Sequence, residues 1–266
     1  MRRQLSFRHE GDVLAGTLDE AGGRVGLLIV TGGTEIRAGA HGGLARLARD
    51  VAAAGFPVFR FDRRGVGDSG GTDPGYDGSG PDIAAAAQAF RAVWPRIEHV
   101  VGFGLCDGAS ALALSGIPLS GLILANPWVV ETSAGTPPPA AIRRRYVERL
   151  TSLDGWKKLL GGSVDYRKLI TGIGSVVRPA RNGLAERIAQ GLSTHGGTIT
   201  AILADGDATA IACSEALDSR SFSGLRRRIE VERIDSGSHS FTGEAHDALL
   251  AAVLAALRRQ EDADQA

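Results

Sequence analysis

Cys106 is the residue whose surroundings most directly suggest chemistry. It stands in the middle of residues 104–108, Gly-Leu-Cys-Asp-Gly, between an apolar run and a stretch rich in Ala and Leu. A strand that enters a helix through one reactive side chain has the geometry of a nucleophile elbow. The two glycines let neighbouring backbone approach without Cβ clashes, and the helix N-terminus favours a thiolate. The pattern predicts a cysteine nucleophile, with a buried structural cysteine as the alternative.

A histidine and an acid are expected downstream, in the order nucleophile, acid, histidine. His239 lies in a short glycine-bearing loop after the last predicted strand and before the last predicted helix. Asp207 follows the strand before it, with Asp205 as the alternative acid. Asp205 could instead be a turn residue, and Asp207 could be the N-cap of a following helix. His246 falls inside the final helix and is expected at the surface.

An oxyanion formed at a carbonyl requires two backbone N–H donors. The first is expected from Asp107, directly after the nucleophile. The second is expected from the glycine-rich loop after the first buried strand, with Gly33 and Thr34 as the candidates. A plain turn is the alternative interpretation of that loop.

Strands and helices alternate along most of the chain. Apolar runs predict strands at 24–30, 57–61, 98–103, 119–125, 198–203 and 229–234, after an N-terminal hairpin at 4–18. Helical spacing predicts helices at 44–54, 83–94 and 244–258. This alternation predicts an α/β protein with a mostly parallel sheet and helices on both faces.

Residues 127–195 interrupt the alternation and predict a helical insertion. The core is therefore expected at 1–126 and 196–266, with 127–195 forming a helical cap or lid. Lys and Arg outnumber Asp and Glu in this segment. The excess is typical of a solvated helical surface, or of a lid that attracts an anionic substrate.

Composition excludes several classes of protein. The 266 residues are 43% hydrophobic and 23% charged, and a net charge of +0 argues against nucleic-acid binding. Two distant cysteines make no disulfide framework, and no signal peptide or transmembrane run is recognised, so a cytoplasmic protein is expected. No metal cluster, Walker loop or dinucleotide fingerprint occurs, so neither metal nor cofactor is expected. The oligomeric state stays open.

Several motifs resemble known families. Residues 62–69, Asp-Arg-Arg-Gly-Val-Gly-Asp-Ser, are similar to the Asp-x-Arg-Gly-x-Gly-x-Ser loop of α/β-hydrolases, which implies that fold. The cysteine elbow resembles the dienelactone-hydrolase branch, which implies that Glu35 modulates the thiol. The elbow, Asn126-Pro127-Trp128 and residues 145–150 resemble the exosortase A system-associated hydrolases of type 1. That family accompanies bacterial exopolysaccharide and protein-sorting loci.

The expected function is hydrolysis of an ester or thioester by Cys106, His239 and Asp207 through an acyl-enzyme. The substrate would be a small-molecule or carrier-linked acyl compound. An acyltransferase with the same triad is one alternative, and a non-catalytic binding protein on a hydrolase scaffold is another.

If the basic segment attracts an anionic substrate, raising the salt concentration should raise KM. Exposed charges are screened over about 10 Å at 0.1 M ionic strength. Combining Arg143→Gln, Arg144→Gln and Arg145→Gln should also raise KM, with little change in kcat. Steady-state kinetics at several salt concentrations measures both effects. A KM that responds to neither change would reduce the basic run to a solvated surface.

Overall fold

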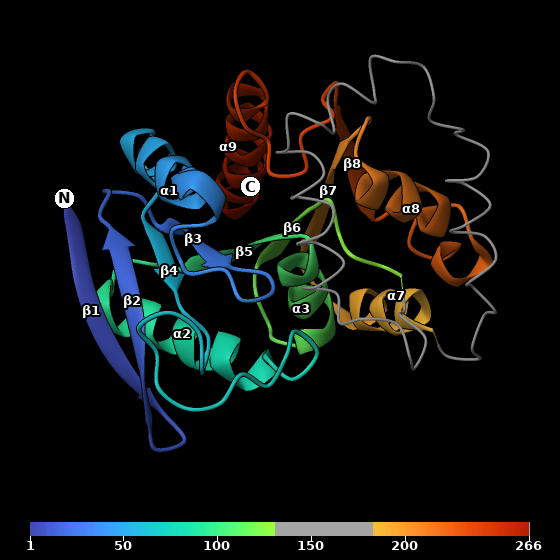
Figure 1. Ribbon diagram of the computed structural model, residues 1–266. Helices are drawn as coiled ribbons and strands as arrows, with labels where there is room; N and C mark the ends of the chain where they lie inside the picture. The colour runs from blue at the N-terminus through green and yellow to red at the C-terminus, as the bar shows by residue number, and fades with distance from the viewer. Residues whose placement is uncertain (131–182, 266) are drawn as a thin grey trace, which may run out of the picture. The chain divides into compact units, whose positions relative to one another are not determined.

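A computed structural model describes residues 1–130 and 183–265 of the chain. This part forms an eight-stranded sheet in the order β1-β2-β4-β3-β5-β6-β7-β8 (Figure 1). Its strands are β1 Arg2–His9, β2 Asp12–Asp19, β3 Val25–Val30, β4 Val58–Phe61, β5 His99–Leu105, β6 Gly121–Ala125, β7 Thr198–Ala204 and β8 Ile229–Ile234. The first two strands form a hairpin, β2 pairs antiparallel with β4, and the remaining pairs are parallel.

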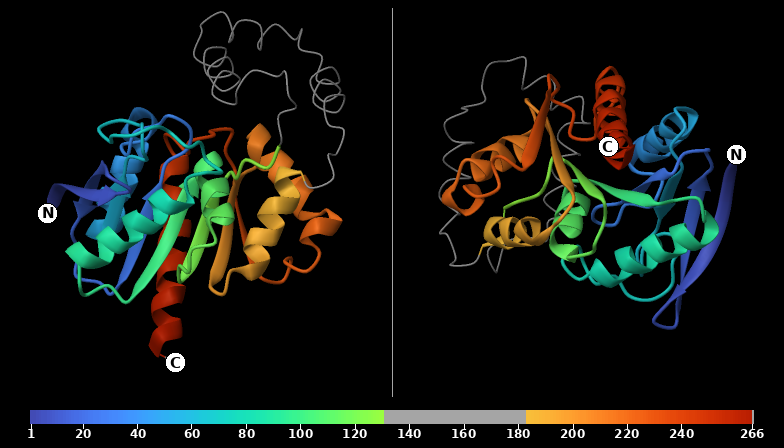
Figure 2. Two further views of the ribbon diagram at one scale, coloured as in Figure 1. Left: turned by 90° about the horizontal axis from the view of Figure 1, so that it is seen from below. Right: turned by 180° about the vertical axis from the view of Figure 1, so that it is seen from behind.

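Helices cover both faces of this sheet. They are α1 Gly43–Ala53, α2 Gly80–Val93, α3 Asp107–Ser115, α7 Leu184–Thr194, α8 Ala208–Leu217 and α9 Ala245–Gln265, with short 3-10 turns at Ala40–Gly42 and Arg220–Phe222. Helices α1 and α9 lie on one face, and α2 and α3 lie on the other (Figure 1). Seen from below, α2 and α3 lie in front of the strands and α9 lies behind them (Figure 2). The predicted α/β class with a mostly parallel sheet is confirmed.

The central strands are buried because both faces of the sheet are covered. Every residue of β3, β4 and β6 is buried, and so is every residue of β5 after His99. Parallel strands covered on both faces are continuously apolar, which is why these strands could be recognised in the sequence. The carboxyl ends of β5, β7 and β8 lead into the turns that hold Cys106, Asp207 and His239.

The predicted cap lies mostly outside the described residues. The chain divides into one compact unit of Met1–Val129 with Ala185–Ala266 and a second of Val130–Leu184. Residues 131–182, with the basic run, are not described. The boundaries of the cap and its role as a lid therefore stay predictions.

His246 is not a surface residue, contrary to the expectation from the sequence. It is 7% exposed, and its Nε2 lies 3.0 Å from Asp50 Oδ2. Helix α9 packs against α1, which carries Asp50, so the helix contact buries the imidazole and supplies its polar partner. A single helical sequence does not reveal which face will meet another helix.

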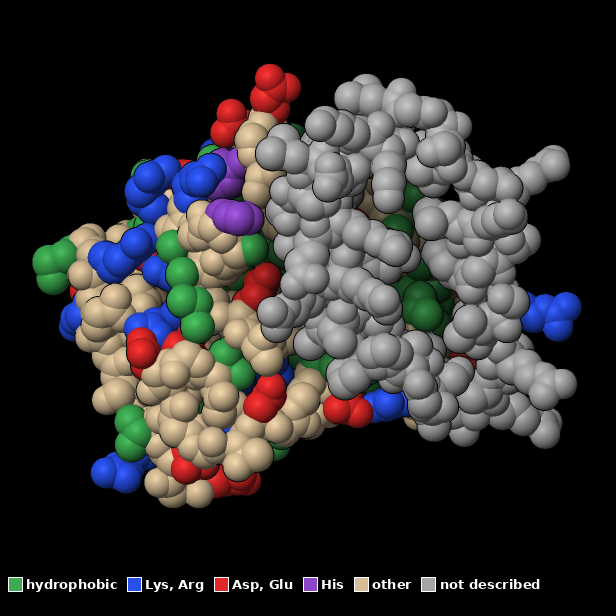
Figure 3. Space-filling view, in the orientation of Figure 1, with side chains coloured by type: hydrophobic (Ala, Val, Ile, Leu, Met, Phe, Trp, Pro, Cys, Tyr) green, Lys and Arg blue, Asp and Glu red, His purple; other side chains and the backbone are tan. Residues whose placement is uncertain are grey.

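Charged side chains of both signs are interspersed on the described part of the face shown in Figure 3. Among the helices that the structure describes, none combines the length and apolar character required to cross a membrane. Most of the basic residues predicted for the insertion, Arg143, Arg144 and Arg145 among them, lie outside the described ranges.

Gly108→Ala should lower the free energy of unfolding by about 1–3 kcal/mol, the usual cost of overpacking. A Cβ at this position would lie 2.5 Å from the Val30 carbonyl oxygen and 3.0 Å from the Thr31 carbonyl carbon. Gly22→Ala is the matched control, since its Cβ would meet nothing within 4 Å. Urea denaturation of both variants measures the difference, and equal midpoints would contradict tight packing of β3 against the elbow.

Candidate active site

Cys106 forms the turn between β5 and α3 in a strained conformation. Its φ is 57° and its ψ is −122°, a combination that residues other than glycine rarely adopt. Its N–H donates to the Ala125 carbonyl at 2.9 Å, and its own carbonyl accepts from the Ala109 and Trp128 amides, each at 3.1 Å. Strain of this kind persists only where the surroundings fix it, and it often marks functional sites. The sulfur-bearing residue is 4% exposed and is the N-cap of α3.

His239 lies between the thiol and a carboxylate. Its Nδ1 is 3.0 Å from Asp207 Oδ1, and the Cys106 side chain lies near enough to raise the pKa of the ring. Because Nδ1 faces Asp207, Nε2 is the nitrogen left for the sulfur. The structure thus brings Cys106, His239 and Asp207 together in the order expected of nucleophile, base and orienting acid.

Asp207 uses its two oxygens for two tasks. Oδ1 contacts His239, and Oδ2 accepts the Thr209 and Ala210 amides at 3.0 Å each, which caps α8. The sequence offered Asp207 either as the acid beside the histidine or as a helix N-cap, and in the structure it makes both contacts. The alternative acid, Asp205, lies 2.9 Å from Arg233 in an ion pair, with the Asp205 side chain 44% exposed.

The two charged groups stabilise each other's ionised forms. Burial opposes ionisation of Asp207, yet the hydrogen bond and charge of His239 and the two capping amides hold its pKa below the ordinary value. Burial alone would lower the pKa of His239, but Asp207 and Cys106 raise it to about 10. The arrangement favours an imidazolium at neutral pH, as a thiolate–imidazolium pair requires.

Asn126 joins the acid strand to the histidine loop, a role that sequence reasoning missed. Its side-chain amide donates to the His239 carbonyl and its Oδ1 accepts the Ala204 amide, both at 2.9 Å. The residue is fully buried and has a φ of 40°, which asparagine tolerates better than most residues. The available signal was a polar residue ending an apolar strand directly before Pro127.

The glycine-rich loop forms a tight turn against the elbow. Gly33 has a φ of 50°, and the Glu35 amide donates to the Gly32 carbonyl at 3.0 Å across the turn. The Gly33 amide donates to Asp107 Oδ2 at 2.9 Å. It can serve as an oxyanion donor only if that bond opens. Thr34 N–H has no hydrogen-bond partner among the described residues, so it is the better candidate of the two.

Glu35 lines a narrow hollow beside the site. The polar side chains of its lining are Glu35, Ser240 and His246, and the large apolar ones are Leu44, Leu47, Phe103, Leu105 and Leu249. The proposed effect of Glu35 on the thiol stays a prediction. Within the described ranges, no group of three or more His, Cys, Asp or Glu residues is arranged to hold a metal ion.

Comparison with family models and with curated proteins finds no match. Solved structures do match. An esterase from Pyrococcus furiosus is similar over 97% of this chain and 91% of its own, with 16% identity and a TM-score of 0.68. An α/β serine hydrolase without a lid from Xanthomonas campestris is similar over 97% of this chain and 94% of its own, with 19% identity and a TM-score of 0.58. A thioesterase domain from the curacin biosynthetic pathway is similar over 96% of this chain and 99% of its own, with 14% identity and a TM-score of 0.58.

These similarities, together with the sheet order, show that the chain has the α/β-hydrolase fold. In this chain Cys106, Asp207 and His239 follow β5, β7 and β8, which is the chain order of nucleophile, acid and histidine in that fold. At these identities the neighbours establish the architecture alone, and the chemistry must be argued from this chain's own residues.

The His239 imidazole should keep its proton until the pH approaches 10. Cys106→Ala and Asp207→Asn should each move its titration to lower pH, because each removes a partner that raises the pKa. NMR titration of the histidine ring protons measures this, with His239→Gln used to assign the signal. A wild-type midpoint near the ordinary value of about 6.5 would contradict the ion pair.

Proposed function

We propose that this protein hydrolyses thioesters or activated esters through an acyl-enzyme on Cys106. The observation that carries the proposal is the strained elbow residue sharing one imidazole with a buried carboxylate. A thiol fixed at such a turn, with a base oriented by a third group, is the arrangement of an activated nucleophile. A cysteine that only filled the core would need neither His239 nor Asp207.

In the acylation step, the Cys106 thiolate attacks the carbonyl carbon of the substrate. The carbonyl oxygen becomes an oxyanion, for which Asp107 N–H and Thr34 N–H are the proposed donors. When the intermediate collapses, the carbon–sulfur or carbon–oxygen bond to the leaving group breaks. The imidazolium of His239 gives its proton to that group, and the acyl chain remains on Cys106 as a thioester.

In the deacylation step, neutral His239 takes a proton from water, whose oxygen attacks the acyl carbon. The second oxyanion collapses, the bond to the Cys106 sulfur breaks, and a carboxylic acid leaves. The thiolate and imidazolium are thereby restored. Asp207 stabilises the imidazolium in the acylation step and in the deacylation step. Thioesters and activated esters suit this chemistry because their leaving groups depart more readily than amines do.

The acyl substrate is proposed to be a small molecule or a carrier-linked chain, and anionic if the basic segment covers the site. A connection to bacterial exopolysaccharide or protein-sorting systems rests on the sequence resemblance. The structures of an esterase and a thioesterase domain among the neighbours are consistent with acyl chemistry on this scaffold.

Turnover of 4-nitrophenyl acetate and of acetyl and longer acyl thioesters tests the proposal. Cys106→Ala should lower kcat/KM by about 10³-fold or more, and mass spectrometry of wild type should detect one acyl group on Cys106. Asp207→Asn should cost roughly 10²–10⁴-fold, because His239 loses its orienting partner.

Asp205→Asn is the matched control, since that carboxylate pairs with Arg233 rather than with His239. A larger loss of activity from Asp205→Asn than from Asp207→Asn would show that Asp205, not Asp207, is the catalytic acid. Full activity in Cys106→Ala would remove the proposal. Product formed only when an alcohol or amine is added would identify an acyltransferase, and absence of labelling and turnover would favour a binding protein.

A further inference from the structure

The turn that supplies the proposed oxyanion donor is held from behind by a buried arginine. Arg63 is the second residue after β4, and β4 lies beside β3, whose end leads into the turn. Its side chain is 1% exposed, and its Nη2 donates to the Gly33 carbonyl. This contact joins residues 30 positions apart in the chain.

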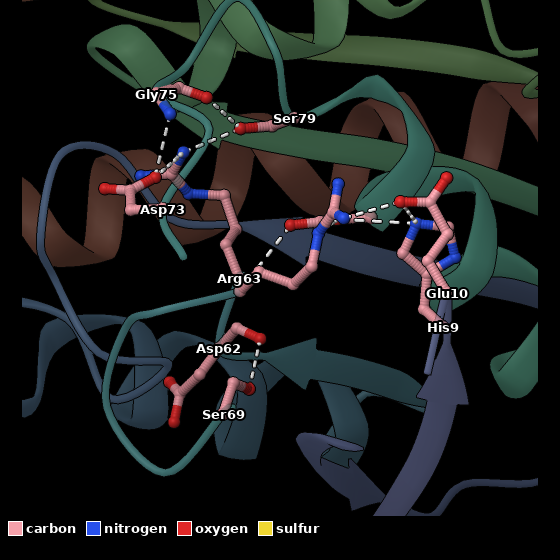
Figure 4. A network of polar contacts seen from close by, with 10 residues as sticks. His9, Glu10, Asp62, Arg63, Ser69, Asp73, Gly75 and Ser79 are labelled. Carbon is pink, nitrogen blue, oxygen red and sulfur yellow. Dashed lines mark hydrogen bonds and ion pairs between the residues drawn. The ribbon is translucent and has the colours of Figure 1, made fainter. Parts of the chain in front are cut away.

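The other end of the guanidinium is anchored in the loop before α2. Arg63 Nη1 donates to Ser79 Oγ at 2.6 Å and lies 3.4 Å from Asp73 Oδ1. Ser79 in turn donates to the Gly75 carbonyl at 2.5 Å, and the Gly75 amide donates to Asp73 at 2.9 Å (Figure 4). Arg63 Nε is buried and has no hydrogen-bond partner in the part of the chain that the structure describes. The guanidinium is thus fixed in direction at the cost of one unsatisfied donor.

The peptide groups on both sides of Gly33 are almost fully engaged. The Gly32 carbonyl accepts from Glu35, the Gly33 amide donates to Asp107, and the Gly33 carbonyl accepts from Arg63. The fourth polar group is Thr34 N–H, which has no partner among the described residues. In a planar trans peptide the C=O and the following N–H point in opposite directions. Holding the Gly33 oxygen toward Arg63 therefore directs Thr34 N–H away from Arg63.

We propose that Arg63 is a positioning residue that sets the direction of the Thr34 N–H and so forms half of the oxyanion hole. The inference rests on the proposed acyl-transfer function and adds a determinant of its transition state. Preorganised donors act because they need no reorientation when charge develops. Burying a guanidinium is costly, and an apolar residue would fill the same space at lower cost. A role in orienting the turn would explain why a charged side chain occupies this buried position.

The test compares an ester with its thionoester, 4-nitrophenyl acetate and the compound in which sulfur replaces the carbonyl oxygen. Sulfur is a poor hydrogen-bond acceptor, so an oxyanion hole accelerates the ester far more than the thionoester. Arg63→Gln should lower kcat for the ester by roughly 10–10²-fold, somewhat below the loss of a complete donor, with KM little changed. The ratio of ester to thionoester turnover should fall with it.

Arg64→Gln is the matched control. Arg64 is the next residue and is also ion-paired, with Asp82 and Glu10 at 2.6 Å each, but among the described residues it makes no hydrogen bond or ion pair with the turn. It should leave the substrate ratio at the wild-type value. Alkylation of Cys106 by iodoacetamide needs the thiolate but no oxyanion hole, so Arg63→Gln should retain the wild-type rate while His239→Gln loses it.

Two further variants keep the test decisive if Arg63→Gln does not fold. Arg63→Lys should recover part of the ratio, and Ser79→Ala, which loosens the guanidinium without touching Gly33, should lower it less than Arg63→Gln does. Equal losses on both substrates in these variants would make Arg63 merely structural and overturn the inference. Wild-type protein that turns over neither substrate would overturn the proposed function itself, and this inference with it.

Discussion

The backbone at Cys106 is the constraint on which the rest of the site depends. A positive φ is unfavourable at a cysteine, so neighbouring elements must hold it. Strand β6 accepts its N–H through Ala125, and the segment leaving β6 returns a hydrogen bond from Trp128 to its carbonyl. The elbow is therefore fixed by the strand beside β5 as much as by β5 and α3. The same crossing from β6 carries Asn126, so one segment holds both the nucleophile and the histidine loop.

Asp207 also has two structural roles at once. Asp207 begins a helix with one oxygen and orients His239 with the other, so the helix start and the catalytic geometry cannot move independently. Its competitor Asp205, only two positions earlier, pairs with Arg233. A carboxylate already bonded to two amides needs little reorganisation to stabilise an imidazolium, which is what electrostatic preorganisation requires. Because Asp207 both caps α8 and contacts His239, we expect that an aspartate at a neighbouring position of the loop could not replace it.

The sequence allowed prediction of the features that depend on local pattern. Continuous apolar runs identified the buried strands, and glycine spacing identified the elbow, because sheet burial and close backbone approach act on neighbouring residues. Contacts between distant residues left no such pattern. His246 meets Asp50 across 196 positions, and Asn126 meets His239 across 113. The sequence favoured Asp207 but left Asp205 open for the same reason, since only the fold decides which carboxylate faces the histidine.

The charges around Gly33 suggest why such a site would favour reactive acyl groups. The Asp107 carboxylate accepts a hydrogen bond from the Gly33 amide, one of the two candidate donors of this loop. A carboxylate at this place opposes a developing negative charge, and the Arg63 guanidinium, which donates to the Gly33 carbonyl, offsets that effect. With these two charges opposed, stabilisation must come mainly from the direction of the remaining amide donors. Under the proposed mechanism, such an oxyanion hole would assist less than one with a net positive field, which fits substrates whose leaving group departs readily, such as thioesters.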